Sequence, residues 1–388
     1  MNRYLDAYVT DDLTKKMVIL TGARQVGKTT LSRQLVQQMP GSVYVNYDVP
    51  ADRAIILASA WPARAPLLVL DEIHKMPGWK AWLKGVFDGR WQGDGKASPT
   101  QQILVTGSAR MDTFRQTGES LAGRYFSHRL HPISVREWCA HTGISADAAM
   151  RHLLARGGFP EPCLAAEESD AQRWRNTYFT DMLREDLVEF SRVREVNAIR
   201  LFAQLLRQRV GSPLSLASIA RDMNVSSTTL ATYLDILEAL FIVFVVRPWS
   251  RNIARATLLQ PKVYFYDTGL VQSDEGVRFE NLVACHLLKN AQWNTDSLGR
   301  PTGLHYVRTK DGAEVDFCLS DESGPEPVLT HLIECKTTDA NLHRALARFA
   351  AEHPEAISLQ LVRDLAKSQE RGGVKVLQAA AWLQELAV

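Results

Sequence analysis

The sequence has few of the features that mark secreted or membrane-bound proteins. Its 388 residues include five cysteines, and none of them stands in a Cys-x-x-Cys pair. An odd number of scattered cysteines argues against a disulfide framework or a zinc ribbon and is typical of a reducing compartment. Residues 1–16 are too polar for a signal peptide, and no apolar run approaches the length that spans a membrane. We therefore expect a cytoplasmic protein without a membrane segment.

Charge of one sign is also scarce. The 45 lysines and arginines nearly balance the 43 acidic residues, which leaves a net charge of +2. Any binding of nucleic acid must therefore depend on local basic patches rather than on the field of the whole molecule. With 46% hydrophobic and 23% charged residues the composition is that of an ordinary globular chain. Its length predicts two or three domains.

A glycine-rich loop follows an apolar run in KMVILTGARQVGKTTLSRQL, residues 16–35. It satisfies the G-x-x-x-x-G-K-[ST] pattern in the required strand-to-helix context, where backbone N–H groups and the helix N-terminus surround phosphate oxygens. We predict that Lys28 reaches the β- and γ-phosphates of ATP and that the Thr29 hydroxyl binds Mg²⁺. A plain glycine turn is the alternative. The predicted nucleotide-binding residues are Gly22, Ala23, Arg24, Gln25, Val26, Gly27, Lys28, Thr29 and Thr30.

Two adjacent acids end the next apolar run, PLLVLDEIH, residues 66–74. The carboxyl ends of parallel strands are where such sheets bind ligands. We predict that Asp71 holds the Mg²⁺ ion through its water shell. Glu72 is predicted to orient or deprotonate the attacking water as a catalytic residue.

The stretch from residue 213 to 249 is typical of a helix-turn-helix. Leu216, Ile219, Ala220 and Met223 suit one short helix, and a turn at 224–225 precedes a second helix that Ser226 caps. The run FIVFVV then predicts a β-hairpin, so the order is that of a winged helix-turn-helix, whose second helix can enter the major groove of DNA. A docking or dimerisation module is the alternative. Two sets of side chains would contact DNA: the hydroxyls of Ser227, Thr228, Thr229 and Thr232, and the guanidinium groups of Arg207, Arg209, Arg221, Arg247, Arg251 and Arg255.

Acidic side chains gather in the C-terminal part, which reads as alternating strands and helices. In AEVDF, Glu314 and Asp316 share one strand face, and in LIECKTT, residues 332–338, Glu334 and Lys336 do the same. Neighbouring strands would bring Asp316, Glu334 and Lys336 together, with Glu280 added from a preceding helix. We predict that Asp316 and Glu334 bind a metal and that the lysine activates water. A solvated strand edge is the alternative.

This D…ExK pattern with a preceding helical glutamate resembles the restriction-endonuclease-like nuclease superfamily. One departure is Val315, where many members of that superfamily have proline. The resemblance implies that the catalytic residues are Glu280, Asp316, Glu334 and Lys336.

Seven motifs, in order along the chain, resemble a widespread prokaryotic family of AAA-type ATPases whose C-terminal half is a domain of unknown function. They are LTGARQVGKTTL, LVLDEIHKMPGW, LVTGSAR, SLAGRY, GGFPEP, YDTGL and EVDF…IECK. The implied fold class is α/β: a P-loop AAA-type ATPase core with a helical lid, a winged helix-turn-helix and a nuclease-like D…ExK domain. We place these four parts at residues 1–135, 136–200, 201–250 and 251–388.

The resemblance also implies a polar residue that senses the γ-phosphate at the end of the third strand, QQILVTGSAR. Ser108 is the first choice for this residue and Thr106 the second, while a plain strand-ending turn is the alternative. An arginine that neutralises the γ-phosphate, often across a subunit boundary, is expected at Arg124, with Arg110 and Arg115 as competitors.

One further helix is expected over residues 170–190. Trp174, Tyr178 and Met182 would form its apolar stripe, while Arg173 and Arg175 would lie outside that stripe.

Together these motifs predict an ATP-hydrolysing DNA-processing protein whose ATPase core and winged helix bind DNA and whose C-terminal domain binds or cleaves it. Branched or end-bearing DNA is a plausible substrate. ATP and Mg²⁺ are the expected cofactors, with Mn²⁺ as a substitute at the nuclease-like site. By analogy with AAA-type engines we expect a homo-oligomer such as a hexameric ring. Two alternatives stay open: a nucleotide-controlled motor or junction remodeller with a silent nuclease fold, and a signalling ATPase that docks onto protein.

Overall fold

The computed structural model describes residues 1–89, 101–107, 121–188, 193–250, 260–309, 311–338 and 341–388, without the side chains of 183–195. It divides into two units, Met1–His131 with Ala239–Phe241, and Pro132–Glu238 with Ile242–Val388. Within the described ranges no helix combines the length and the apolar character needed to cross a membrane.

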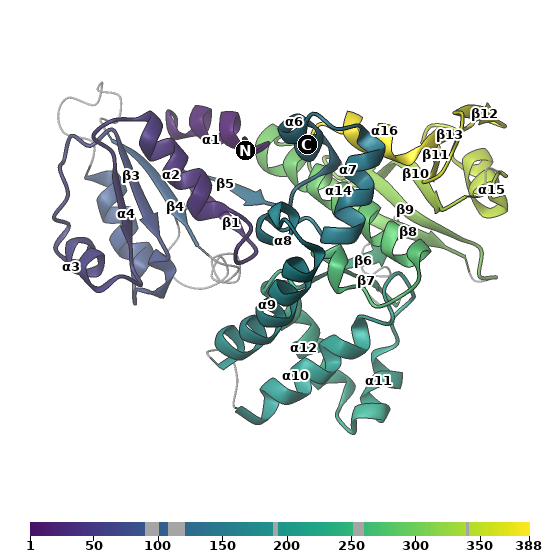
Figure 1. Ribbon diagram of the computed structural model, residues 1–388, viewed down its shortest axis with the longest axis horizontal. Coiled ribbons are helices and arrows are strands. Elements are labelled where there is room, and N and C mark those ends of the chain that lie inside the picture. The colour runs from purple at the N-terminus through teal and green to yellow at the C-terminus, as the bar shows by residue number, and fades with distance from the viewer. Residues whose placement is uncertain (90–100, 108–120, 189–192, 251–259, 310, 339–340) are drawn as a thin grey trace. The chain divides into compact units, whose positions relative to one another are not determined.

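The first unit is built around a fully parallel five-stranded sheet in the order β2-β3-β4-β1-β5 (Figure 1). Strands β1 and β3 are buried along their whole length, as their apolar sequences predict. Because all five strands run in the same direction, the residues that follow them gather at one edge of the sheet. The strands are β1 (Met17–Gly22), β2 (Val43–Asn46), β3 (Leu67–Asp71), β4 (Gln102–Thr106) and β5 (Tyr125–Leu130); the helices are α1 (Asp6–Leu13), α2 (Lys28–Gln38), α3 (Pro50–Ala58), the 3₁₀ turn η1 (Ile73–Lys75) and α4 (Trp79–Asp88).

Helices make up the first half of the second unit. They begin at ordinary capping signals: Ser134 and Glu137 form a capping box at α6, and Ser145 caps α7. The helices are α6 (Val135–Thr142), α7 (Ala146–Arg156), α8 (Pro160–Leu164), α9 (Glu168–Val188), α10 (Val193–Leu206), α11 (Leu216–Met223) and α12 (Ser227–Ala239).

An eight-stranded mixed sheet forms the second half, in the order β12-β13-β11-β10-β9-β8-β6-β7. Strand β6 pairs antiparallel with β7 and parallel with β8, so the hairpin that follows α12 belongs to the same sheet as the C-terminal strands. The strands are β6 (Val243–Pro248), β7 (Lys262–Phe265), β8 (Thr302–Arg308), β9 (Glu314–Asp321), β10 (Val328–Lys336), β11 (Ile357–Val362), β12 (Gln369–Arg371) and β13 (Val374–Gln378); the helices are the 3₁₀ turn η3 (Thr268–Leu270), α14 (Glu275–Leu298), α15 (Arg344–Glu352) and α16 (Ala379–Glu385).

The prediction that Arg175 lies outside the packed face of α9 is wrong. Its side chain is buried and forms an ion pair with the buried Asp267 at 3.2 Å. Glycines provide the space for this pair: a Cβ atom at Gly157 would lie 2.0 Å from Asp267 Oδ1, and one at Gly269 would lie 2.0 Å from Arg175 Nε. The GGFPEP and YDTGL motifs therefore meet around one buried ion pair.

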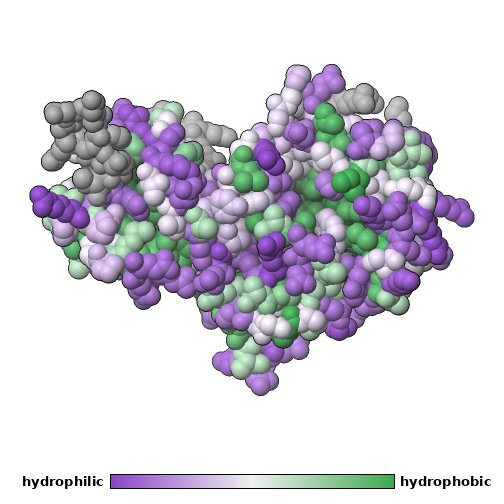
Figure 2. Space-filling view, turned by 90° about the horizontal axis from the view of Figure 1, so that it is seen from above, coloured by the Kyte–Doolittle hydropathy of each residue, from purple (hydrophilic) through white to green (hydrophobic). Residues whose placement is uncertain are grey.

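Hydrophilic side chains predominate on the face shown in Figure 2, where hydrophobic residues occur in separate small groups. The large hydrophobic residues that are exposed in the described chain are likewise spread over many elements, as in Leu57, Leu164 and Val328. Scattered residues of this kind are ordinary on a protein surface.

Candidate nucleotide site and carboxylate cluster

The predicted phosphate-binding loop lies between β1 and α2. Gly22 has φ +146°, and a Cβ atom there would lie 2.4 Å from the Leu130 carbonyl oxygen of β5, so the close approach of the two strands requires glycine. Lys28, the first residue of α2, donates from Nζ to the carbonyl oxygens of Gly22 and Ala23, both at 2.8 Å. The loop therefore connects a buried strand to a helix N-terminus, as the sequence predicts, while the contact of Lys28 with phosphates stays a prediction.

Asp71, at the end of β3, is the centre of a small polar network. The Thr29 hydroxyl lies 3.1 Å from Oδ2 of Asp71, and the Tyr44 hydroxyl donates to the same oxygen at 2.5 Å. The Thr106 hydroxyl donates to the other oxygen, Oδ1. Adjacent hydroxyl and carboxylate oxygens are the ligand type that Mg²⁺ prefers, so these residues fit the predicted ion. Tyr44 was missed by sequence reasoning; burial and then Asp71 raise its pKa to about 12.

Glu72 follows Asp71 in a left-handed backbone conformation, φ +55°. Its backbone N–H donates to the Thr106 carbonyl at 3.0 Å, which places it beside the end of β4. Its carboxylate Oε2 lies 3.3 Å from Lys75 Nζ. Burial raises the pKa of Glu72, which makes its carboxylate a better proton acceptor.

The predictions of a γ-phosphate sensor and of an arginine that neutralises the γ-phosphate have separate outcomes. Ser108, Arg110 and Arg115 lie outside the described residues, whereas Thr106 lies in the Asp71 network. Arg124 forms a two-point ion pair with Asp88, the last residue of α4, at 2.9 and 3.0 Å. That Arg124 neutralises the γ-phosphate stays a prediction.

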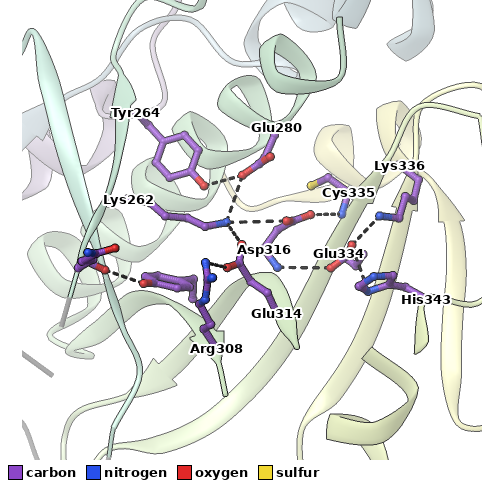
Figure 3. Close-up of polar contacts among 12 residues, drawn as sticks. Lys262, Tyr264, Glu280, Arg308, Glu314, Asp316, Glu334, Cys335, Lys336 and His343 are labelled. Atoms are coloured by element: carbon purple, nitrogen blue, oxygen red, sulfur yellow. Dashed lines mark hydrogen bonds and ion pairs between the residues drawn. The ribbon is translucent and has the colours of Figure 1, made fainter. Parts of the chain in front are cut away.

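Four acidic side chains of the second unit lie close together: the three predicted site residues Glu280, Asp316 and Glu334, and Glu314. We call these four residues the carboxylate cluster (Figure 3). Glu280 comes from α14, and the other three come from the paired strands β9 and β10. The backbone N–H of Asp316 donates to Glu334 Oε2 at 3.4 Å. Asp316 Oδ2 in turn accepts from the backbone N–H of Cys335 at 2.8 Å.

Lys336 and His343 both contact Glu334. Lys336 Nζ lies 2.7 Å and His343 Nδ1 lies 3.2 Å from Glu334 Oε1. Burial alone would raise the pKa of Glu334, but the hydrogen bonds from these two side chains lower it below its usual value. The predicted proximity of Glu334 and Lys336 is therefore present.

A buried lysine that sequence reasoning missed also enters the carboxylate cluster. Lys262, the first residue of β7, is 1% exposed, and its Nζ lies 2.7 Å from Glu314, 3.6 Å from Glu280 and 3.9 Å from Asp316. Burial alone would lower the pKa of Lys262, but these three carboxylates raise it above the usual value. Tyr264, on the same strand face, donates to Glu280 at 2.6 Å.

These neighbours do not fit a metal site at the carboxylate cluster. Among the described residues no group of three or more histidine, cysteine or acidic side chains is arranged to hold a metal ion. The Lys262 ammonium lies among the acids that would have to face such an ion.

The two helices predicted within residues 213–249 are present as α11 and α12. Asn224 makes the turn in the left-handed conformation, φ +54°, and the backbone N–H of Thr229 donates to Ser226 Oγ at 2.9 Å as a helix cap. Ser227, Thr228 and Thr232 are exposed.

The predicted DNA-contacting residues are not all equally available. Thr229 is half-buried and contacts Ser226, while Arg207 is half-buried and donates to the Leu270 carbonyl at 2.6 Å. Arg251 and Arg255 lie outside the described residues, whereas Arg209, Arg221 and Arg247 are exposed.

Three family models match consecutive parts of the chain. Residues 14–139 match an AAA domain, residues 147–279 match a domain of unknown function (DUF8612) and residues 275–382 match another (DUF4143). The first match covers the phosphate-binding loop and the Asp71 network. The fold and site thus define a P-loop ATPase domain. The chain thus contains an AAA-type ATPase domain at residues 14–139 and ends in a domain of unknown function at residues 275–382.

Relatives and solved structures are similar over much of the chain. An uncharacterized protein of Mycobacterium tuberculosis is 28% identical over 353 residues, covering 87% of this chain and 77% of its own. One of Methanocaldococcus jannaschii is 21% identical over 346 residues, covering 80% and 74%. A Walker-type ATPase of Pyrococcus abyssi has a TM-score of 0.43 at 13% identity, covering 69% of this chain and 93% of its own. A RuvB variant of Thermotoga maritima has a TM-score of 0.31 at 18% identity, covering 66% and 90%.

Proposed function

We propose that the protein is an ATP-hydrolysing, DNA-binding protein in which the first unit turns over ATP and the helix-turn-helix contacts DNA. The observation that carries the DNA proposal is the sequence of α11, a left-handed turn, α12 and the antiparallel β6–β7 pair, which is the order of a winged helix-turn-helix. The exposed hydroxyls of Ser227, Thr228 and Thr232 on α12 suit contacts with phosphates or base edges.

The ATPase proposal assigns one role to each side chain around Asp71. Lys28 binds the phosphates of ATP, and Thr29 with Asp71 holds Mg²⁺, which offsets phosphate charge when bound. Glu72 accepts a proton from the attacking water, a role that its raised pKa favours. Thr106, which contacts Asp71 directly, replaces Ser108 as our candidate for sensing the γ-phosphate.

Nucleotide turnover is tested with Lys28→Ala, which removes the ammonium group that the loop carbonyls hold at 2.8 Å. We expect loss of ATP binding or turnover, measured as phosphate release, with an unchanged circular dichroism spectrum. Unchanged hydrolysis would remove the role of this loop. We further propose a homo-oligomer such as a hexameric ring, in which Arg124 completes a neighbour's site; sedimentation with and without ATP measures that assembly.

DNA binding is tested with a matched pair of threonines. Thr232 on α12 and Thr180 on α9 are both exposed, and each donates its hydroxyl to the carbonyl four residues earlier. Thr232→Glu places a negative charge on the proposed DNA face and should weaken binding to labelled duplex and four-way-junction DNA, whereas Thr180→Glu should not.

The readout is fluorescence anisotropy between about 50 and 200 mM salt, because phosphate contacts weaken steeply over that range. Equal binding by the two variants contradicts the assignment of α12. No binding to any DNA at low salt would favour a protein-docking role instead.

Cleavage of DNA is a second candidate function, which the positions of Asp316, Glu334 and Lys336 on β9 and β10 support and the Lys262 ammonium among the acids opposes. Labelled single-stranded, duplex, flap and four-way-junction DNA would be incubated with ATP and Mg²⁺ or Mn²⁺. Cutting by the wild type that disappears in Asp316→Ala would establish this function. DNA binding without cutting leaves the ATPase as the working enzyme.

A further inference from the structure

The carboxylate cluster already contains a cation that the chain itself supplies. Figure 3 shows the Lys262 side chain extending from β7 between Glu280, Glu314 and Asp316. Its ammonium nitrogen is 2.7 Å from Glu314, 3.6 Å from Glu280 and 3.9 Å from Asp316. A side chain that is 1% exposed cannot extend into solvent as most lysines do.

We propose that Lys262 Nζ takes the cation position of the carboxylate cluster, so that the protein keeps a nuclease-like arrangement of acids without binding a divalent metal there. A Mg²⁺ ion needs oxygen ligands at about 2.0–2.1 Å in octahedral geometry. To reach Asp316 and Glu280 it would have to lie within a few ångströms of the ammonium group, where like charges repel strongly in a buried site.

The other cluster contacts also occupy the carboxylates. Glu280 accepts from the Tyr264 hydroxyl at 2.6 Å, and Glu314 accepts from Arg308 at 3.0 Å. Each of these donors faces an oxygen that a metal would otherwise use.

A charge count points the same way. The four carboxylates of the cluster are matched by three cationic side chains in ion-pair contact, Lys262, Arg308 and Lys336. Four negative minus three positive charges leaves one negative charge, which is little attraction for a divalent cation.

The backbone fixes the lysine on both sides. Lys262 pairs with Val246 across the β6–β7 ladder and forms an isolated bridge with Pro213. The backbone of Lys262 is therefore held beside the carboxylates that its ammonium group contacts. This inference does not rest on ATP turnover or DNA binding, and it argues against metal-dependent cleavage at the cluster.

The test is Mn²⁺ binding, measured by the electron paramagnetic resonance signal of free Mn²⁺ without nucleotide. All proteins carry Thr29→Ala so that the phosphate-binding loop does not contribute. The background protein should show no Mn²⁺ site at the cluster. Lys262→Met should gain one site whose affinity for Mn²⁺ is at least about 10-fold higher than any residual binding by the background protein, because a like charge has been removed. Adding Asp316→Asn should abolish the gained site. Lys336→Met alone is the control: it removes the same charge but leaves the Lys262 ammonium among the acids, so it should gain no site.

Two results would overturn the proposal. One is Mn²⁺ binding by the background protein that Asp316→Asn removes. The other is a folded Lys262→Met protein that gains no site. If Lys262→Met does not fold, Lys262→Met/Glu314→Gln removes one of the opposing carboxylates as well and is measured in the same way. Even if neither variant folds, Mn²⁺ binding at the cluster by the protein that carries Thr29→Ala alone would refute the proposal.

Discussion

The ion pair between Arg175 and Asp267 offers a quantitative test of how the second unit is held together. The two side chains are 5% and 1% exposed, with 3.2 Å between Arg175 Nε and Asp267 Oδ2. Asp267 Oδ1 also accepts from the Gly269 backbone N–H at 3.0 Å, and Arg175 Nη2 donates to the Ala155 carbonyl at 3.4 Å. The pair therefore connects α9 with α7 and with the segment that follows β7.

We expect Arg175→Met to lower the free energy of unfolding of this unit by about 3–5 kcal/mol at neutral pH, the usual cost of removing one partner of a buried pair. The cost arises because Asp267 stays buried without its counter-ion; burial already raises its pKa. Arg175→Met/Asp267→Leu should recover a large part of that loss, since no uncompensated charge remains.

Urea unfolding followed by circular dichroism measures these changes. Arg173→Met is the matched control, because Arg173 lies on the same helix, is 84% exposed and forms a loose 3.7 Å pair with Asp170; its loss should change stability little. The reasoning is refuted if Arg175→Met stays within about 0.5 kcal/mol of the wild type, the range typical of surface substitutions. A double variant as unstable as the single one would refute it equally.

Three further predictions concern pH and turnover. Burial lowers the pKa of His286 to about 4, and its Nε2 accepts from the Val135 backbone N–H at 2.9 Å, so unfolding is favoured as the pH falls from the unfolded value near 6.5. The second unit should lose about 2 kcal/mol between pH 7.5 and 5 in urea unfolding; a loss of the same size in His286→Leu would show that another group is responsible. Glu72→Gln should keep ATP binding and stop phosphate release, and unchanged turnover would exclude it as the base. Tyr44→Phe removes the hydroxyl that orients the Asp71 carboxylate and should raise the Mg²⁺ concentration for half-maximal turnover about 10-fold. An unchanged Mg²⁺ requirement would mean that Tyr44 does not position Asp71.

Local patterns were sufficient to predict the elements that carry the sequence motifs. The loop from Gly22 to Thr29 and the acids at 71–72 could be placed because strand, turn and helix signals lie next to one another in the chain. The pairing of Asp316 with Glu334 also followed, since two adjacent strands with period-two alternation leave few registers that bury their apolar faces.

Contacts between distant segments could not be read in this way. Arg175 and Asp267 are 92 residues apart in the sequence, and a helical wheel assigns an arginine to solvent when its partner is unknown. In the sequence Lys262 is an ordinary polar residue at the start of a strand, and its ion pairs form with acids from α14 and β9 that lie far from it in the chain. Tyr44 had no local signal, because its role depends on the pairing of β2 beside β3.

A lysine held among carboxylates has a consequence for how this part of the chain responds to its surroundings. The counter-ion is covalently attached, so it is not lost on dilution or to a chelator, and its supply does not vary with the metal content of the cell. The negative charge of the acids is therefore largely offset wherever β7 packs beside α14 and β9. In exchange, the charge balance of the cluster depends on one residue: a change at Lys262 removes this built-in counter-ion and leaves the acids dependent on a cation from solution.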